Sequence, residues 1–285
     1  MAFSEVHGVR FRYDEAGSGP AVVLCHAGIA DRRMWTGPFE ALAGDCRVVR
    51  FDWRGYGESG PATAQHMLHA DLLGLLDALG IGRAVLAGCS VGGAAALDAA
   101  LAAPDRVAGL VLVGSGLSGH TWPEDMADPL QDLIAEAVPE ERRRAYRDGT
   151  NDTVLGADVE AAADAHARFW VAGPRRDPGA VDPRVWDTAM TMLRQVFRRE
   201  WTEHSVEPGT PQPPANGRLS EVDVPTVVVN GLDDVPALQQ IADLLTAGIP
   251  AAHRVDLPDT GHLAPLERPQ QVTAAIDGLL HQLIP

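Results

Sequence analysis

A serine that could act as a nucleophile stands at position 90 of this 285-residue sequence. It is the centre of the segment GCSVGG (88–93), which follows the apolar run AVLA and precedes the alanine-rich stretch AAALDAALAA. This is a G-x-S-x-G motif between a predicted strand and a predicted helix, where a tight turn requires glycine on both sides of the serine. The turn would present the Ser90 hydroxyl at a helix N-terminus, whose amides favour negative charge.

A base and a carboxylate that could activate this serine follow later in the chain. A serine hydroxyl needs a base to remove its proton, and the base needs an acid to hold its tautomer. His262 lies in TGHLAPLERP (260–269), and NGLDDVP (230–236) offers two carboxylates, Asp233 and Asp234. Both segments follow predicted strands, so they come to the same edge of the sheet as Ser90, in the order Ser, Asp, His that suits the motif.

The elements that must position these residues alternate between short apolar runs and longer helical patterns. Such alternation indicates βαβ units and a largely parallel sheet. Most of the runs are nearly continuous in apolar residues, as is typical of strands covered on both faces. We predict strands at 9–14, 21–25, 47–52, 84–89, 107–114, 226–230 and 252–257, and helices at 66–79, 91–103, 235–247 and 267–283.

One long segment departs from this alternation. From about residue 117 to 201 the chain reads as successive helices, and it is followed by the proline-rich stretch SVEPGTPQPPANG (205–217), which cannot form regular structure. An insertion of about 85 residues is too long for a crossover, so it predicts a helical cap over the edge of the sheet where open α/β folds bind ligands. We therefore expect a core of residues 1–116 and 206–285 and a cap of residues 117–205.

Five blocks of the sequence resemble one known family when they are taken in order. They are LCHAG (24–28), FDWRGYGES (51–59), GCSVGG, NGLDDVP and TGHLAPLERP. Their order and spacing resemble the Ser-dependent α/β-hydrolases, in the capped group that includes enol-lactonase-like esterases and cofactor-free haloperoxidases. The resemblance implies an α/β class fold, the α/β-hydrolase fold, with a mostly parallel central sheet flanked by helices and an all-helical cap inserted after the sixth strand.

The resemblance also assigns roles to individual residues. Ser90 resembles the nucleophile, and His262 the general base that later acts as acid. The family pattern G-x-x-D-x-P places the orienting acid at Asp234, with Asp233 as the competitor.

Two backbone amides would form the oxyanion hole of such an enzyme. The resemblance assigns them to Val91, the residue after the nucleophile, and to Gly28. Ala27 stands where the family usually has glycine, so Ile29 is the alternative donor.

Substrate contacts are expected from the loop after the strand at 21–25 and from the cap. His26 either ties its loop by hydrogen bonds or contacts substrate, and Ile29 lies in the same loop. In the cap, where an aromatic stripe is more often core than pocket, the candidates are Trp170, Met190 and Leu193. An anionic substrate group would have to meet an arginine, and the first to test are Arg168, Arg175 and Arg176.

The charge balance excludes several classes of function. The chain has 39 acidic and 23 basic residues and a net charge of −16, which repels nucleic acid and anionic lipid. All 23 basic residues are arginine, so no Schiff-base lysine, pyridoxal phosphate anchor or P-loop lysine exists.

The three cysteines lack paired spacing, which favours a reducing compartment. Since the sequence shows no apolar leader or membrane span, we expect a cytoplasmic protein. His66 and His69 lack a third ligand, so no metal site is expected.

These observations predict a hydrolase of carboxylic esters or lactones that works through an acyl-serine intermediate and needs no cofactor. The partner would be a small-molecule ester or lactone, with neither nucleic acid nor membrane involved, and the protein would be a monomer or homodimer. A thioesterase or C–C bond hydrolase could use the same triad. A biosynthetic cyclase or a ligand-binding protein on the same fold is the alternative of a different class.

Overall fold

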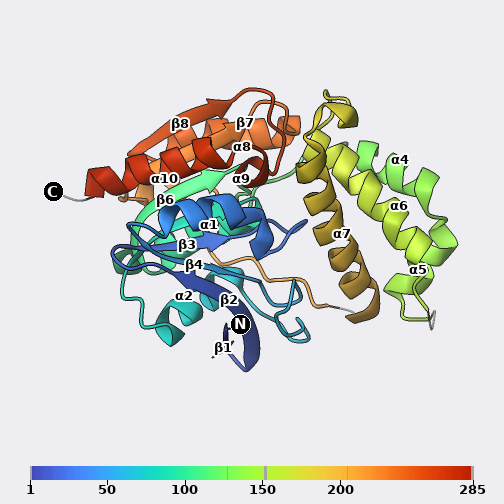
Figure 1. Cartoon of the computed structure of the whole chain (residues 1–285), viewed down its shortest axis with the longest axis horizontal. Helices are drawn as coiled ribbons and strands as arrows, with labels where there is room; N and C mark the ends of the chain where they lie inside the picture. Colours follow the sequence, from blue (N-terminus) through green and yellow to red (C-terminus); the bar gives the residue numbers. More distant parts are fainter. Residues whose placement is uncertain (1, 127, 151–152, 204, 284–285) are drawn as a thin grey trace.

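The computed structural model describes residues 2–126, 128–150, 153–203 and 205–283. Within these residues the strands form one eight-stranded sheet in the order β1-β2-β4-β3-β5-β6-β7-β8 (Figure 1). β1 pairs antiparallel with β2, and β2 with β4, while all other neighbours are parallel. The strands are β1 (Ala2–Val6), β2 (Val9–Ala16), β3 (Ala21–Cys25), β4 (Arg47–Phe51), β5 (Ala84–Cys89), β6 (Val107–Val113), β7 (Thr226–Gly231) and β8 (Ala252–Leu257).

Helices cover both faces of the sheet because its central strands are apolar on both sides. Alternate residues of β6 show this: Val111 and Val113 belong to one buried cluster, and Leu110 and Leu112 to the other. One face packs against α1 (Thr36–Leu42) and α10 (Pro269–Leu283). The opposite face packs against α2 (Leu68–Ala78), α3 (Val91–Ala102) and α8 (Pro236–Gly248).

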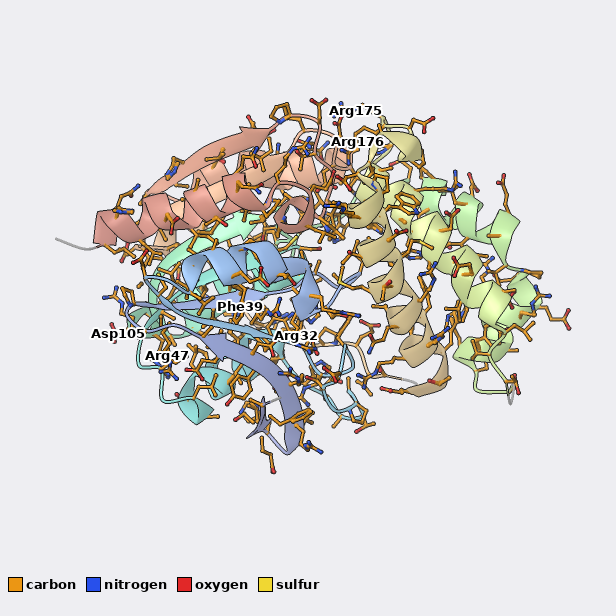
Figure 2. The ribbon with its side chains drawn as sticks, in the orientation of Figure 1. Arg32, Phe39, Arg47, Asp105, Arg175 and Arg176 are labelled. Carbon is orange, nitrogen blue, oxygen red and sulfur yellow. The ribbon has the colours of Figure 1, made fainter. Side chains whose placement is uncertain are left out.

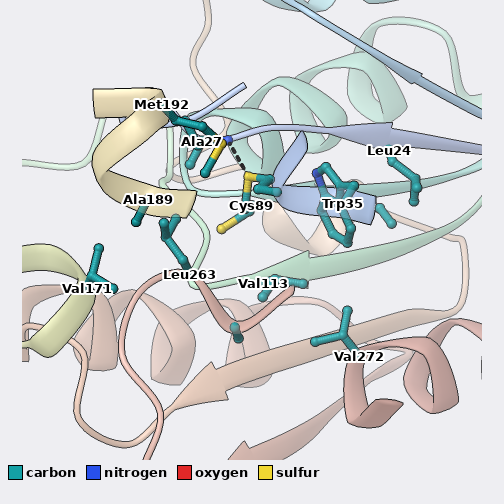
Figure 3. Close-up of a cluster of buried hydrophobic side chains, with 14 of the residues drawn as sticks. Leu24, Ala27, Trp35, Cys89, Val113, Val171, Ala189, Met192, Leu263 and Val272 are labelled. Atoms are coloured by element: carbon teal, nitrogen blue, oxygen red, sulfur yellow. Dashed lines mark hydrogen bonds between the residues drawn. The ribbon is translucent and has the colours of Figure 1, made fainter. Parts of the chain in front are cut away.

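A helical insert separates β6 from β7, as the sequence predicts, and lies beyond one end of the sheet (Figure 1). Its interior is continuous with the core, since Val171, Ala189 and Met192 of the insert share one cluster of buried side chains with Cys89 and Leu263 of the core (Figure 3). Residues 205–218 then return to the sheet without helix or strand. The insert contains α4 (Asp128–Ala137), α5 (Glu140–Arg147), α6 (Gly156–His166), the π-helical turn η3 (Ala167–Ala172), the 3-10 turn η4 (Pro178–Ala180) and α7 (Pro183–Glu203).

The long helix α7 is also tied to the core by hydrogen bonds. The Arg199 guanidinium donates to the carbonyls of Tyr56, Gly57 and Ser59 at 2.9 to 3.0 Å. The Gln195 amide donates to the Gly57 carbonyl at 2.7 Å. These bonds hold the insert against the loop that follows β4.

Several elements differ from the sequence-based predictions. The predicted strands lack β1, a five-residue strand that exists because it pairs with β2 along its whole length. The predicted helices lack a counterpart for α1, because its sequence contains Gly37 and Pro38, which are not typical of helices. The helix predicted at 267–283 begins at Pro269 as α10, and a separate short helix, α9 (Ala264–Glu267), precedes it. The described residues also include three short 3-10 turns in the core: η1 (Arg32–Trp35), η2 (Pro104–Arg106) and η5 (Leu219–Glu221).

Candidate active site

Ser90 occupies a sharp turn between β5 and α3. Its φ of 57° and ψ of −121° lie in a region that residues other than glycine rarely adopt. A Cβ on Gly88 would come within 2.3 Å of the Gly92 carbonyl oxygen, and one on Gly92 within 2.4 Å of the Cys25 carbonyl oxygen. The two glycines of the motif are therefore required because backbone from β3 and from the turn itself packs directly against them.

His262 and Asp234 form a buried hydrogen-bonded pair. The loops after β8 and β7 bring His262 Nδ1 to 2.7 Å from Asp234 Oδ2, and both side chains are at most 2% exposed. The other carboxylate oxygen accepts the Val235 amide at 2.7 Å. Since an ionised carboxylate only accepts, Nδ1 carries the proton and Nε2 is left with a free lone pair. Asp233 instead faces Arg176, at 3.9 Å.

Gly114, which sequence reasoning missed, provides the space for this pair. It directly follows β6 and has a φ of +45°. A Cβ at this position would lie 3.1 Å from Asp234 Oδ2 and 3.3 Å from His262 Nδ1. The sequence signal that could have indicated this role is a glycine at the carboxyl end of a predicted central strand. Gly114 lies outside the five blocks that resemble the family, so the resemblance assigned it no role.

Ser90 and His262 line one cavity of about 390 Å³. Gly28, Ile29, Val91 and Trp170, all predicted site residues, line it as well, so the structure brings these positions together with Ser90 and His262. Most other lining side chains are apolar and were missed by the sequence analysis, because their positions in a loop and in two different helical regions show no common pattern. They are Ala94, Leu117, Trp122, Met126 and Leu238, with Gly116 and Ser118 beside them.

Two unpaired amides border this cavity. Within the described part of the chain, the amides of Gly28 and Val91 have no hydrogen-bond acceptor. The Ala27 amide, in contrast, donates to Met34 Sδ at 3.3 Å. A Cβ on Gly28 would lie 3.7 Å from the Val91 side chain, so the two residues are neighbours. Their amides are therefore available to a ligand oxygen beside Ser90.

Trp170 holds His262 from the cap side. Its carbonyl accepts the His262 amide at 3.1 Å, and its ring lies 4.8 Å from the imidazole between centroids. The other predicted cap residues lie elsewhere: Met190 and Leu193 are buried in the cluster that joins insert and core and do not line the cavity.

His26 is fully buried and ties two loops together. Its Nδ1 lies 2.8 Å from the Ala27 carbonyl, and its Nε2 accepts the Trp53 amide at 2.9 Å. Burial lowers the pKa of His26, so the ring is held neutral with both nitrogens engaged. This arrangement corresponds to the loop-tying interpretation of the residue.

The three cap arginines predicted to meet an anionic group instead bind other groups of the protein. Arg168 pairs with Asp164 at 2.6 Å, and Arg175 donates to the Leu232 carbonyl. Arg176 lies where the insert meets the core (Figure 2) and forms an ion pair with Glu267 at 2.8 Å. None of them lines the cavity that holds Ser90.

Metal-ligating groups do not converge anywhere in the described ranges, where no three His, Cys, Asp or Glu side chains could hold an ion together. Among the same residues, no helix is both long and apolar enough for a membrane crossing.

The fold and the residues around Ser90 define the class of protein. Residues 20–269 match the alpha/beta hydrolase fold family, and the chain belongs to it. The chain is 26% identical, over 93% of its length and 98% of the relative's, to a pimeloyl-[acyl-carrier protein] methyl ester esterase of Nitrosomonas europaea. Some other curated relatives are matched over only about a third of their own length.

Solved structures show the same architecture. A thermophilic esterase from Thermogutta terrifontis superposes with a TM-score of 0.76 at 25% identity, covering 100% of this chain and 99% of that one. The enol-lactonase from Burkholderia xenovorans LB400 superposes with a TM-score of 0.72 at 23% identity, covering 98% and 100%. This protein is thus an alpha/beta hydrolase whose relatives include esterases and lactonases.

Proposed function

We propose that this protein hydrolyses carboxylic esters or lactones through an acyl-serine intermediate, with Ser90, His262 and Asp234 as its catalytic triad. The observation that carries the proposal is the buried Asp234–His262 pair opening onto the same cavity as Ser90. Among the described residues that line the cavity, His262 is the only one with an acidic or basic side chain, so the chemistry rests on these groups.

The reaction would proceed in two halves. Ser90 Oγ attacks the ester carbonyl carbon while His262 Nε2 takes its proton, and the tetrahedral intermediate expels the alcohol, which leaves with that proton. His262 then takes a proton from water as the water oxygen attacks the acyl carbonyl carbon. When the second tetrahedral intermediate collapses, the bond to Ser90 Oγ breaks, His262 returns the proton to this oxygen, and the acid is released. Asp234 keeps Nδ1 protonated and stabilises the imidazolium, while the amides of Gly28 and Val91 bind the oxyanion.

The helical insert, residues 117–205, would act as the cap domain of this enzyme. Trp122, Met126 and Trp170 all come from this segment and line the cavity beside Ser90. Because the described residues that line it include no carboxylate or guanidinium, the part of the substrate nearest the serine should be uncharged and apolar.

Active-site labelling combined with a hydrolysis assay tests the proposal. A fluorophosphonate should modify Ser90, and Ser90→Ala should lower kcat on a p-nitrophenyl ester about 10⁴-fold. The matched control is Ser4→Ala on β1, at the sheet edge, which should keep both label and activity. Near wild-type turnover by Ser90→Ala would refute the proposal. A labelled protein that hydrolyses no ester, thioester or lactone would favour the cyclase alternative, and a folded protein that is not labelled would favour ligand binding.

A further inference from the structure

A second hollow of about 180 Å³ adjoins the cavity that holds Ser90. The two share Val91, Ala94 and Ser118 as lining residues, so they meet along the first turns of α3. The second hollow is also lined by Asp98, which is on α3, and by residues 208–211 of the proline-rich segment. A substrate lying along this helix would therefore pass from Ser90 to Asp98 without leaving the surface of the two hollows.

Asp98 is a buried carboxylate, and one of its two oxygens makes no hydrogen bond to the described part of the protein. The residue is only 8% exposed, and its Oδ1 accepts the Ser118 hydroxyl at 2.6 Å. Among the described residues, Oδ2 has neither a hydrogen-bond donor nor an ion-pair partner within bonding distance. Burial raises the pKa of Asp98, while the hydrogen bond from Ser118 and the charges of His69 and Arg218 oppose this shift.

Helix geometry sets the distance between the two ends of this path. Asp98 follows Ser90 by eight residues, which is about 12 Å along the axis at 1.5 Å per residue. Between them, the small side chains of Ala94 and Ala95 form part of the floor. The hollow thus suits an extended chain that spans roughly two helical turns.

Asp98 and His69 are the titratable side chains among the described residues that line the second hollow, and Arg218 is close enough to lower the pKa of Asp98. Further negative charge lies beside this hollow. A third hollow, of about 140 Å³, shares Leu68, Val91 and Pro208 with it and carries Glu200 and Glu207. Arg54, which also lines the third hollow, is neutralised by a buried ion pair with Asp71. With a net charge of −16, the protein as a whole also attracts cations. The cavity at Ser90 therefore favours an apolar end of a substrate, and the hollow at Asp98 favours a positively charged end of the same substrate.

We propose that Asp98 binds an ammonium group of the substrate, about 12 Å from the ester carbonyl that Ser90 attacks. The preferred substrates would be esters with one apolar end and one aliphatic amine end. This inference rests on the proposed function, because it takes Ser90 as the reacting residue. Asp98 sets specificity and takes no part in bond breaking.

Matched esters test this inference. One probe carries an ω-ammonium group about 12 Å from the carbonyl and the other a methyl group in its place, with the amine tested in the acyl and in the alcohol half. A charge-assisted hydrogen bond should raise kcat/KM for the preferred ammonium ester about tenfold over its methyl analogue. Asp98→Asn keeps an acceptor for Ser118 but removes the charge, so this ratio should fall to near one.

The control is Asp105→Asn, which removes the same charge from an exposed position at the far end of the sheet and should leave the ratio at its wild-type value (Figure 2). In the wild-type protein, a linear alkylammonium should inhibit about tenfold better than the alkanol of equal length, a test that requires no variant. Equal kcat/KM for both esters in an active wild-type enzyme would overturn the inference, as would a preference that survives Asp98→Asn. If the wild-type protein hydrolyses neither ester, the proposed function is refuted instead.

Discussion

Arg176 should hold the loop of His262 in place, and replacing it by methionine removes that support while keeping the aliphatic stem. Its guanidinium pairs with Glu267 at 2.8 Å and donates to the carbonyls of Val171, Ala172 and Asp259 at 2.6 to 2.8 Å. Glu267 in turn accepts the amide of Gly261 at 2.9 Å, directly before His262. One arginine therefore connects the insert to the loop of the proposed base.

The expected loss of stability follows from burial. The side chains of Arg176 and Glu267 are 11% and 3% exposed, so Arg176→Met leaves a carboxylate without its counter-charge and out of water. Removing one partner of a buried ion pair lowers the free energy of unfolding by about 3–5 kcal/mol. A shift in the His262 loop should also lower kcat, by about tenfold or more.

Urea unfolding and steady-state kinetics measure these two effects. Burial already raises the pKa of Glu267, and losing Arg176 should raise it further, so the destabilisation should shrink at acid pH as Glu267 takes up a proton. Arg175→Met is the matched control, because Arg175 is 63% exposed and should change stability by about 0.5 kcal/mol or less. If Arg176→Met unfolds within about 1 kcal/mol of wild type and keeps its kcat, the argument from burial is wrong.

Two further predictions concern the site and the insert. Gly114→Ala should lower kcat about tenfold or more, since the new Cβ would crowd Asp234 and His262 at 3.1 to 3.3 Å, whereas Gly44→Ala, with open space at its Cβ, should not. Burial lowers the pKa of His166 from 6.5 to about 4, so the folded protein binds fewer protons than the unfolded chain between those values. The free energy of unfolding should therefore fall by up to about 3 kcal/mol between pH 6.5 and pH 4, and an His166→Phe variant that loses as much as wild type over this range would contradict the assignment.

Much of the fold follows from local pattern. The apolar runs of β3, β5, β6 and β7 are visible in the sequence because a strand covered on both faces must be apolar throughout. The insert is visible because no crossover needs so many residues. β1 is not visible, since a short edge strand with exposed alternate residues owes its structure to pairing with β2.

The residues of the candidate site divide in the same way. Ser90 can be identified from its sequence motif, because a turn this tight requires glycine at positions 88 and 92. The hydrogen bond of His262 to Asp234, and not to Asp233, exists only in the folded chain, since adjacent residues of a loop point in different directions. The cap contributes differently from expectation: of the three cap residues predicted to contact substrate, Trp170 lines the cavity, while Met190 and Leu193 are buried core.

The sequence by itself therefore determined the family, the strands β2 to β8, the insert and the position of the proposed nucleophile, because each depends on residues close together in the chain or on blocks in a fixed order. Tertiary structure alone decided the shape and lining of the cavity, the role of Gly114 as space for the Asp–His pair, and the use of Arg176 as a clamp. Those features depend on which side chains from distant segments meet, and packing between segments leaves no periodic trace in any one of them.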